Sequence, residues 1–217
     1  MFFGWFLFSR EFKSFQYRKI PVFHLQNRTK NFARKKQKHE LSIRAAEFIS
    51  NGDIIGIDSG STAVFFAEML KEKFSKLTVV THSIDVFEML SNHKDFSVIL
   101  CGGHYLREEN AFYGELTLNM LKSLHVQKAF IFPSAVSLEY GIYDYHKDLC
   151  QIQKQLIRSS DEIYILADSS KFEKTGLLKL NNMKLEYVYI TDSLLQDGIV
   201  KLYKENSIKI YFGKEEK

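Results

Sequence analysis

The chain has 217 residues, of which 45% are hydrophobic, and its formal net charge at pH 7 is +4. This length and apolar content suffice for one substantial core, and so mild a charge does not by itself indicate a nucleic-acid-binding surface. The two cysteines, Cys101 and Cys150, fit neither a metal-binding spacing nor a disulfide framework. We therefore expect a reducing, cytoplasmic environment, with no metal and no other cofactor.

Residues 1–38 differ in composition from the rest of the chain and are interpreted as an N-terminal extension or connector. The first eight residues are apolar, but Arg10 and Glu11 follow, whereas a membrane span needs roughly 20 apolar residues. A signal peptide would need a basic start and a small-residue cleavage site, which this segment lacks. The basic run from Arg28 to Lys38 indicates either a solvated helix or linker, or an arm that contacts nucleic acid.

From residue 39 onward the pattern becomes regular and predicts one domain over residues 39–217. A helical pattern over residues 40–50 ends in a Gly-Asp turn, and strands then alternate with amphipathic helices. The predicted strands cover residues 54–58, 77–83, 96–103, 128–134, 162–168, 185–192 and 208–213, and the predicted helices cover 61–74, 84–93, 114–125, 146–160 and 193–206. Short, continuously apolar strands between such helices predict an α/β fold with a mostly parallel, Rossmann-like sheet and helices on both faces.

Most of the predicted strands end in hydroxyl groups, glycines or a carboxylate. In a parallel sheet, ligands bind beyond the carboxyl ends of the strands, where these side chains converge. A single such end is typical of a helix cap, but several at one edge favour a shared polar site. The polar ends are residues 58–62, 81–83, 102–103, 133–134, 168–171 and 191–192.

The segment Asp-Ser-Gly-Ser-Thr at residues 58–62 indicates an anion site between a strand and a helix. Gly60 allows close backbone approach, Ser61 and Thr62 supply hydroxyl groups, and the helix start adds outward N–H groups and roughly half a positive charge. Asp58 would repel a phosphate, so it either accepts hydrogen bonds from sugar hydroxyls or holds N–H groups of the loop. The simpler alternative for the whole segment is a plain helix N-cap.

Two other strand ends carry groups that suit an anion or its sugar. Lys171 is either a point charge for a phosphate or an exposed lysine bonded to the sheet edge. His82 lies between Thr81 and Ser83, where a hydrogen-bonding or spacer role is favoured over acid–base chemistry.

The segments GDIIGIDSGSTA, LTVVTHS, VILCGG, ILADSSKFEKTG and ITD, within residues 40–192, resemble the C-terminal sensor domain of DeoR/GlpR-type transcriptional regulators. The resemblance implies a fold similar to ribose-5-phosphate isomerase, glucosamine-6-phosphate deaminase and CoA transferases. It also implies a phosphorylated sugar or related metabolite as effector, in control of carbohydrate-metabolism genes. The implied site comprises Asp58, Ser59, Gly60, Ser61 and Thr62 as phosphate loop, Thr81, His82 and Ser83 with His82 replacing the usual Asn, Gly102 and Gly103 as the next loop, and Lys171.

The chain departs from the family pattern after the fourth predicted strand. Ser134 stands where the family often has Asp, at a place where the related isomerases carry acids. Because an isomerase needs a base, this favours a sensor without turnover over a sugar-phosphate isomerase or deaminase-like enzyme. Asp144 and Asp148 follow closely and remain candidate bases; Asp148 and Ser134 are also counted as effector-binding residues.

The second departure concerns DNA. Regulators of this kind begin with a helix-turn-helix, for which residues 1–38 are too short and show no recognition-helix pattern. We therefore expect DNA contact only through a helix-turn-helix absent from this chain, no membrane partner, and a homo-oligomer, since operator readers pair through symmetric contacts.

Overall fold

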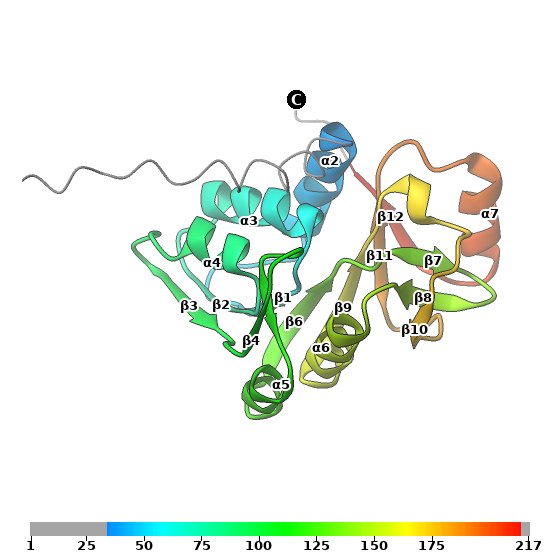
Figure 1. Cartoon of the computed structure of the whole chain (residues 1–217). Helices are drawn as coiled ribbons and strands as arrows, with labels where there is room; N and C mark the ends of the chain where they lie inside the picture. Colours follow the sequence, from blue (N-terminus) through cyan, green and yellow to red (C-terminus); the bar gives the residue numbers. More distant parts are fainter. Residues whose placement is uncertain (1–33, 214–217) are drawn as a thin grey trace, which may run out of the picture.

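A computed structural model of the chain describes residues 34–213, which form a seven-stranded sheet flanked by helices (Figure 1). All neighbouring strands of this sheet are parallel. Their order is β12 (Lys209–Phe212), β11 (Val188–Thr191), β9 (Ser160–Leu166), β6 (Val126–Ile131), β1 (Ile54–Ile57), β2 (Leu77–Thr81) and β3 (Phe96–Leu100). The α/β class with a mostly parallel sheet is thus confirmed.

Helices cover both faces of the sheet, as predicted (Figure 1). On one face lie α2 (Lys35–Ala46), α3 (Ser61–Lys73) and α4 (Ile84–Leu90), and on the other lie α5 (Glu115–Lys122), α6 (Lys147–Arg158) and α7 (Asp197–Glu205). Strand β6 serves both cores, because Phe130 packs with the α2–α4 layer whereas Ala129 and Ile131 pack with the opposite layer. This two-sided burial explains why the central strands are continuously apolar.

Two helices begin several residues away from their predicted starts. Helix α2 begins at Lys35, so the expected boundary between residues 38 and 39 falls inside it. Residues 1–33 of the expected extension lie outside the described part of the chain. The helix predicted over residues 193–206 begins only at Asp197, because Asp192 Oδ1 accepts the Leu194 N–H at 2.9 Å and holds a turn there.

Five short strands were not predicted. A hairpin consists of β4 (His104–Leu106) and β5 (Ala111–Tyr113), and a second, antiparallel sheet has the order β10 (Leu178–Asn181), β8 (Gly141–Asp144), β7 (Ala135–Ser137). Each has only three or four residues, which is too short for a periodic pattern to stand out. They matter for function because the β4–β5 turn and the end of β8 reach the carboxyl edge of the large sheet.

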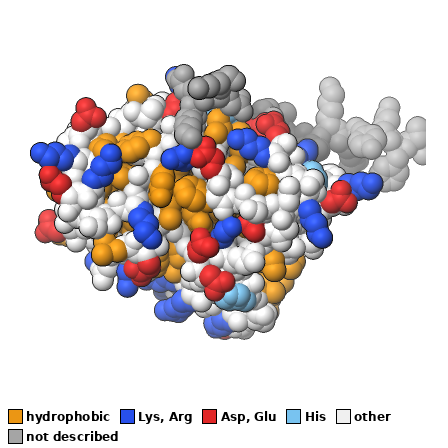
Figure 2. Space-filling model, turned by 180° about the vertical axis from the view of Figure 1, so that it is seen from behind, with side chains coloured by type: hydrophobic (Ala, Val, Ile, Leu, Met, Phe, Trp, Pro, Cys, Tyr) orange, Lys and Arg blue, Asp and Glu red, His pale blue; other side chains and the backbone are white. Residues whose placement is uncertain are grey.

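Two features of the described region bear on membrane and nucleic-acid partners, namely the length of its helices and the charge of its surface. None of the helices within residues 34–213 is long and apolar enough to cross a membrane. Figure 2 shows a face on which hydrophobic side chains gather near the middle, among Lys and Arg side chains interspersed with Asp and Glu. The described part of this face is therefore mixed in charge, unlike the basic stripe of a typical nucleic-acid-binding surface.

A test of the packing compares two adjacent glycines at the end of β3. A Cβ atom on Gly103 would lie 2.5 Å from the Tyr113 carbonyl oxygen and would collide with Thr117 Oγ1, whereas a Cβ on Gly102 would meet nothing within 4 Å. We expect Gly103→Ala to lower the free energy of unfolding by about 1–3 kcal/mol, because the crowding involves backbone. Gly102→Ala is the control and should change stability by less than about 0.5 kcal/mol. Equal midpoints of urea unfolding for the two variants would contradict the close approach of Tyr113 and Thr117 to Gly103.

Candidate functional site

A cavity of about 420 Å³ opens at the carboxyl edge of the large sheet. Its volume lies within the range of about 300–1,000 Å³ that is usual for small-molecule sites. It is lined by residues 59–62 of the β1–α3 loop, Asp85 of α4, residues 108–110 of the β4–β5 turn, Phe132 and Ser134 after β6, residues 144–146, Leu149 and Gln153 at the end of β8 and on α6, and Lys171 of the short helix η2 (Ser169–Lys171).

The β1–α3 loop brings the start of α3 to this cavity. Gly60 is the N-cap residue, with φ 117° and ψ 172°, a conformation that residues with a side chain rarely adopt. Among residues 34–213, no side chain caps α3, and of its first N–H groups that of Ala63 donates to the Gly60 carbonyl oxygen at 3.1 Å. Ser61 and Thr62 lie in this first turn and line the cavity. The arrangement differs from a plain side-chain N-cap and suits an anion.

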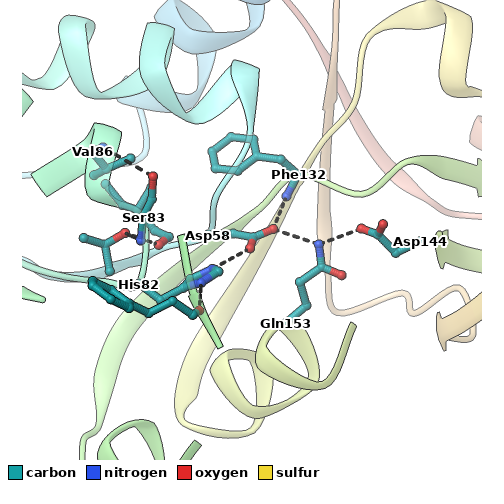
Figure 3. Close-up of polar contacts among 10 residues, drawn as sticks. Asp58, His82, Ser83, Val86, Phe132, Asp144 and Gln153 are labelled. Carbon is teal, nitrogen blue, oxygen red and sulfur yellow. Dashed lines mark hydrogen bonds and ion pairs between the residues drawn. The ribbon is translucent and has the colours of Figure 1, made fainter. Parts of the chain in front are cut away.

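Asp58 anchors the base of the site instead of facing the cavity. Its side chain is fully buried, and Figure 3 shows three groups converging on its carboxylate. Oδ2 accepts the Phe132 N–H at 3.2 Å and the Gln153 Nε2–H at 2.9 Å, and Oδ1 lies 3.1 Å from His82 Nε2. Asp58 therefore joins the ends of β1, β2 and β6 to helix α6, and it is not among the lining residues.

His82 makes two hydrogen bonds and is almost completely buried, which agrees with the hydrogen-bonding role favoured from the sequence. Its Nδ1 lies 2.8 Å from the Phe112 carbonyl oxygen, which can only accept, so Nδ1 carries a hydrogen. Its Nε2 faces the Asp58 carboxylate, and both contacts are hydrogen bonds when the ring is an imidazolium. The histidine thus ties the β4–β5 hairpin to the buried carboxylate.

Gln153 connects Asp58 to a second carboxylate, that of Asp144, as Figure 3 shows. Its Nε2 donates to Oδ2 of both aspartates at 2.9 Å, which fixes the orientation of the amide. Within the described residues, its buried Oε1 has no hydrogen-bond partner. The sequence analysis missed Gln153, because a glutamine on the buried face of an otherwise ordinary amphipathic helix gives no motif.

Asp144 places an acid at the cavity although the sequence has Ser134 at the position where the family often has Asp. Its Oδ1 accepts the Ser134 hydroxyl at 3.0 Å and the Tyr145 N–H at 2.6 Å. Asp148, the other candidate, is half-buried in the first turn of α6 and does not line the cavity. The strand β8, which was not predicted, is what carries Asp144 to Ser134.

Lys171 has features of both interpretations drawn from the sequence, a positive charge for a phosphate and a lysine bonded to the sheet edge. It is half-buried and lines the cavity, and its Nζ donates to the Pro133 carbonyl oxygen at 2.7 Å. Burial lowers the pKa of Lys171, and the negative charges around it, Asp168 first and then Asp144, act in the opposite direction. An ammonium group has three donors, so two remain for a ligand.

The remaining residues of the predicted site support its walls. Thr81 Oγ1 donates to the Ile57 carbonyl at 2.8 Å and accepts the Ser83 N–H at 3.1 Å, and Ser83 caps α4 by accepting the Val86 N–H at 3.4 Å. The Gly102 carbonyl accepts from Thr117 at 3.1 Å. Thr81, His82, Ser83, Gly102 and Gly103 are all absent from the lining of this cavity.

The three groups that contact the Asp58 carboxylate allow a direct test of its anchoring role. Asparagine has one acceptor oxygen and an NH₂ group, so when His82 is an imidazolium Asp58→Asn forces at least one donor to face another. We expect the free energy of unfolding to fall by about 1–3 kcal/mol. Asp161→Asn is the matched control, because Asp161 also pairs with a histidine, His125 at 3.0 Å, but both side chains are exposed. That exposed pair should contribute no more than about 1 kcal/mol. Similar losses in both variants would contradict the anchoring role of Asp58.

Comparison with known proteins gives relatives among bacterial transcription regulators. The chain is 28% identical to the L-fucose operon activator of Haemophilus influenzae, covering 79% of this chain and 68% of the relative. It is 30% identical to the HTH-type transcriptional regulator YulB of Bacillus subtilis, covering 80% and 67%. It is 28% identical to the glycerol-3-phosphate regulon repressor of Haemophilus influenzae, also covering 80% and 67%.

Solved structures with a similar backbone include ribose 5-phosphate isomerase A from Methanocaldococcus jannaschii. Its TM-score is 0.47 at 17% identity, over 64% of this chain and 55% of the isomerase. The match to a protein family is more extensive, since residues 33–193 match the DeoR C terminal sensor domain. With most of the sheet and the whole lining of the cavity inside that match, the chain belongs to the family of DeoR C-terminal sensor domains.

Proposed function

We propose that the cavity binds a phosphorylated sugar or a related phosphorylated metabolite, and that the chain senses this effector for a transcription regulator. The observation that carries the proposal is the pairing, in one cavity, of the uncapped start of α3 with Lys171. The helix start offers N–H donors and a partial positive charge, and the lysine offers a full one. Together with the hydroxyl groups of Ser61 and Thr62, they suit a phosphate group.

The cavity also holds acceptors that suit a sugar. Asp85, Glu108 and Asp144 line it, and carboxylates are acceptors for hydroxyl groups. The names of two relatives support the same class of ligand, since one is an activator of an L-fucose operon and another a repressor of a glycerol-3-phosphate regulon. A phosphate at α3 with its polyol portion toward these carboxylates would use both sets of groups.

Removing the two hydroxyl groups of the loop tests the phosphate position. Thermal-shift screening with ribose 5-phosphate, glucosamine 6-phosphate and glycerol 3-phosphate first finds a ligand, which should stabilise by about 2.7 kcal/mol at one hundred times its Kd. Calorimetry on Ser61→Ala/Thr62→Ala should then give affinity at least about tenfold weaker, because hydrogen bonds to a charged group are lost.

The control for this test is Ser97→Ala, an exposed serine on the edge strand β3, which should leave affinity unchanged. Unaltered affinity in the double variant would contradict the loop assignment.

An enzymatic function is the second candidate, because Asp144 provides a buried carboxylate at the cavity. Both Asp144 oxygens already accept hydrogen bonds, from Ser134 and Gln153 among others, so the carboxylate is engaged within the protein. The relatives named above are transcription regulators, which favours binding without turnover.

We therefore expect no enzyme-dependent product from ribose 5-phosphate or glucosamine 6-phosphate. Enzymatic turnover, at an ordinary rate of about 1 per second or more, would replace the sensor proposal by an isomerase or deaminase. Product analysis by chromatography decides between them, and loss of that turnover in Asp144→Asn, but not in Asp148→Asn, would identify the base.

The proposal also covers the location of the sensor, its contact with DNA and its oligomeric state. Membership of the family supports a cytoplasmic regulator that acts on DNA through a helix-turn-helix outside the described residues, and that works as a homo-oligomer. Light scattering after size exclusion measures the oligomeric state.

A further inference from the structure

Helix α6 contributes one wall of the cavity. His146 at its N-cap, Leu149 and Gln153 all line the cavity, and they follow each other at intervals of three and four residues. Residues at this spacing share one face of a helix. The cavity face of α6 therefore carries a polar side chain near each end, about two helical turns apart, with a leucine between them.

Both polar side chains of this face have a buried atom that lacks a hydrogen-bond partner among residues 34–213. The two atoms are Oε1 of Gln153 and Nδ1 of His146. Gln153 is the more deeply buried residue, with only 2% of its surface exposed, whereas His146 is half-buried. Because a buried polar atom without a partner is costly in free energy, such an atom on a cavity wall points to a ligand group that pairs with it.

The orientation of the Gln153 amide is determined by two aspartates. Its Nε2 donates to Oδ2 of Asp58 and to Oδ2 of Asp144, both at 2.9 Å. Figure 3 shows both bonds at the amide nitrogen, with the amide oxygen directed away from Asp58. If the amide were turned over, its oxygen would face two carboxylate oxygens, so that acceptors would meet acceptors. Oε1 is therefore an acceptor in a fixed position, and only a donor can pair with it.

The carboxylate beside this amide is already engaged with donors of the chain. Asp144 Oδ1 accepts the Ser134 hydroxyl at 3.0 Å and the Tyr145 N–H at 2.6 Å, and Oδ2 accepts from Gln153. A phosphate group at neutral pH offers mainly acceptor oxygens, whereas a sugar hydroxyl can donate. The Gln153 oxygen thus suits the polyol portion of a ligand and does not suit its phosphate.

We propose that Gln153 determines specificity in this cavity, and that its Oε1 accepts a hydrogen bond from a hydroxyl group of the ligand. The proposal rests on the proposed function, because it concerns the same phosphorylated ligand. It adds that the ligand carries a hydroxyl group remote from its phosphate, on the side of Asp144 and α6. A phosphate ester without this hydroxyl leaves Oε1 unpaired, and so the site selects against it.

Replacing Gln153 with lysine separates the donor and acceptor roles of its amide. An ammonium group has three donors and no acceptor, so Gln153→Lys can still donate to both aspartates but cannot accept from a ligand. Calorimetry gives the affinity for ribose 5-phosphate, glucosamine 6-phosphate or glycerol 3-phosphate, whichever the thermal-shift screen selects. Competition against that ligand gives the affinity for inorganic phosphate. The ratio of the two affinities should fall by about tenfold or more in Gln153→Lys.

The ratio isolates the hydroxyl contact, because the added positive charge of the lysine acts on both phosphates alike. Gln151→Lys is the matched control, since Gln151 is exposed on the same helix and undergoes the same change of charge. Its ratio should stay within about twofold of that of the parent chain. If Gln153→Lys fails to fold, Gln153→Met replaces it with the same expected fall, because methionine adapts to the space and has no amide oxygen.

Each outcome decides a different point. A fall in the ratio confined to Gln153→Lys supports the acceptor role of Gln153. An unchanged ratio in that variant, together with weaker binding by Ser61→Ala/Thr62→Ala, overturns this role and leaves the proposed function intact. Equal falls in Gln151→Lys and Gln153→Lys trace the effect to charge and also overturn it. If the parent chain binds none of the three phosphorylated compounds, both proposals are overturned.

Discussion

The buried carboxylate of Asp58 is the interaction on which the sensor site depends. It lies directly after β1, and it receives hydrogen bonds from the residue after β6, from His82 after β2 and from Gln153 on α6. A carboxylate completely removed from water is tolerated only when hydrogen-bond donors replace the lost water. These conditions fix three strand ends and one helix relative to each other. The loop at residues 59–62 begins at this fixed point, so the start of α3 is held at the cavity.

This architecture separates support from binding. The Asp58 carboxylate, which would repel a phosphate, lies beneath the loop beside His82. Ser61, Thr62 and Lys171, in contrast, line the cavity. Gln153 continues the support to Asp144, so the acid at the cavity is positioned by the same network that holds the loop. The cavity is therefore lined by hydroxyl donors, a lysine and carboxylate acceptors. That combination is the physical basis for proposing a phosphorylated polyol as its ligand.

The position of α2 links the site to the beginning of the described chain. Glu40 holds one part of the helix to the turn after β11, and Arg34 holds its start to η2, with Lys38 between them on the buried side. A sensor must convert occupancy of a cavity into a change elsewhere, and a ligand can do so only through contacts that differ between its free and bound states. Through Arg34, helix α2 contacts the N-cap of η2, which carries the cavity residue Lys171.

The sequence by itself determined the fold class, the order of the main strands and helices, and the position of the polar loop at residues 58–62. Those features are local: continuously apolar strands, helices with one apolar face, and a glycine between hydroxyl residues each leave a short-range pattern. Only the tertiary structure decided which polar residues line the cavity. Asp58, Thr81 and Ser83 lie at strand ends like Ser61, yet their side chains point into the supporting network, since the direction of a side chain at a strand end depends on its neighbours in space.

Asp144 and Gln153 illustrate the other half of this division. They lie at the end of a strand too short to predict and within an ordinary helix. Long-range packing of β8 and α6 brings them to the cavity. No local pattern encodes such placement, because it arises from contacts between segments that are distant in the sequence.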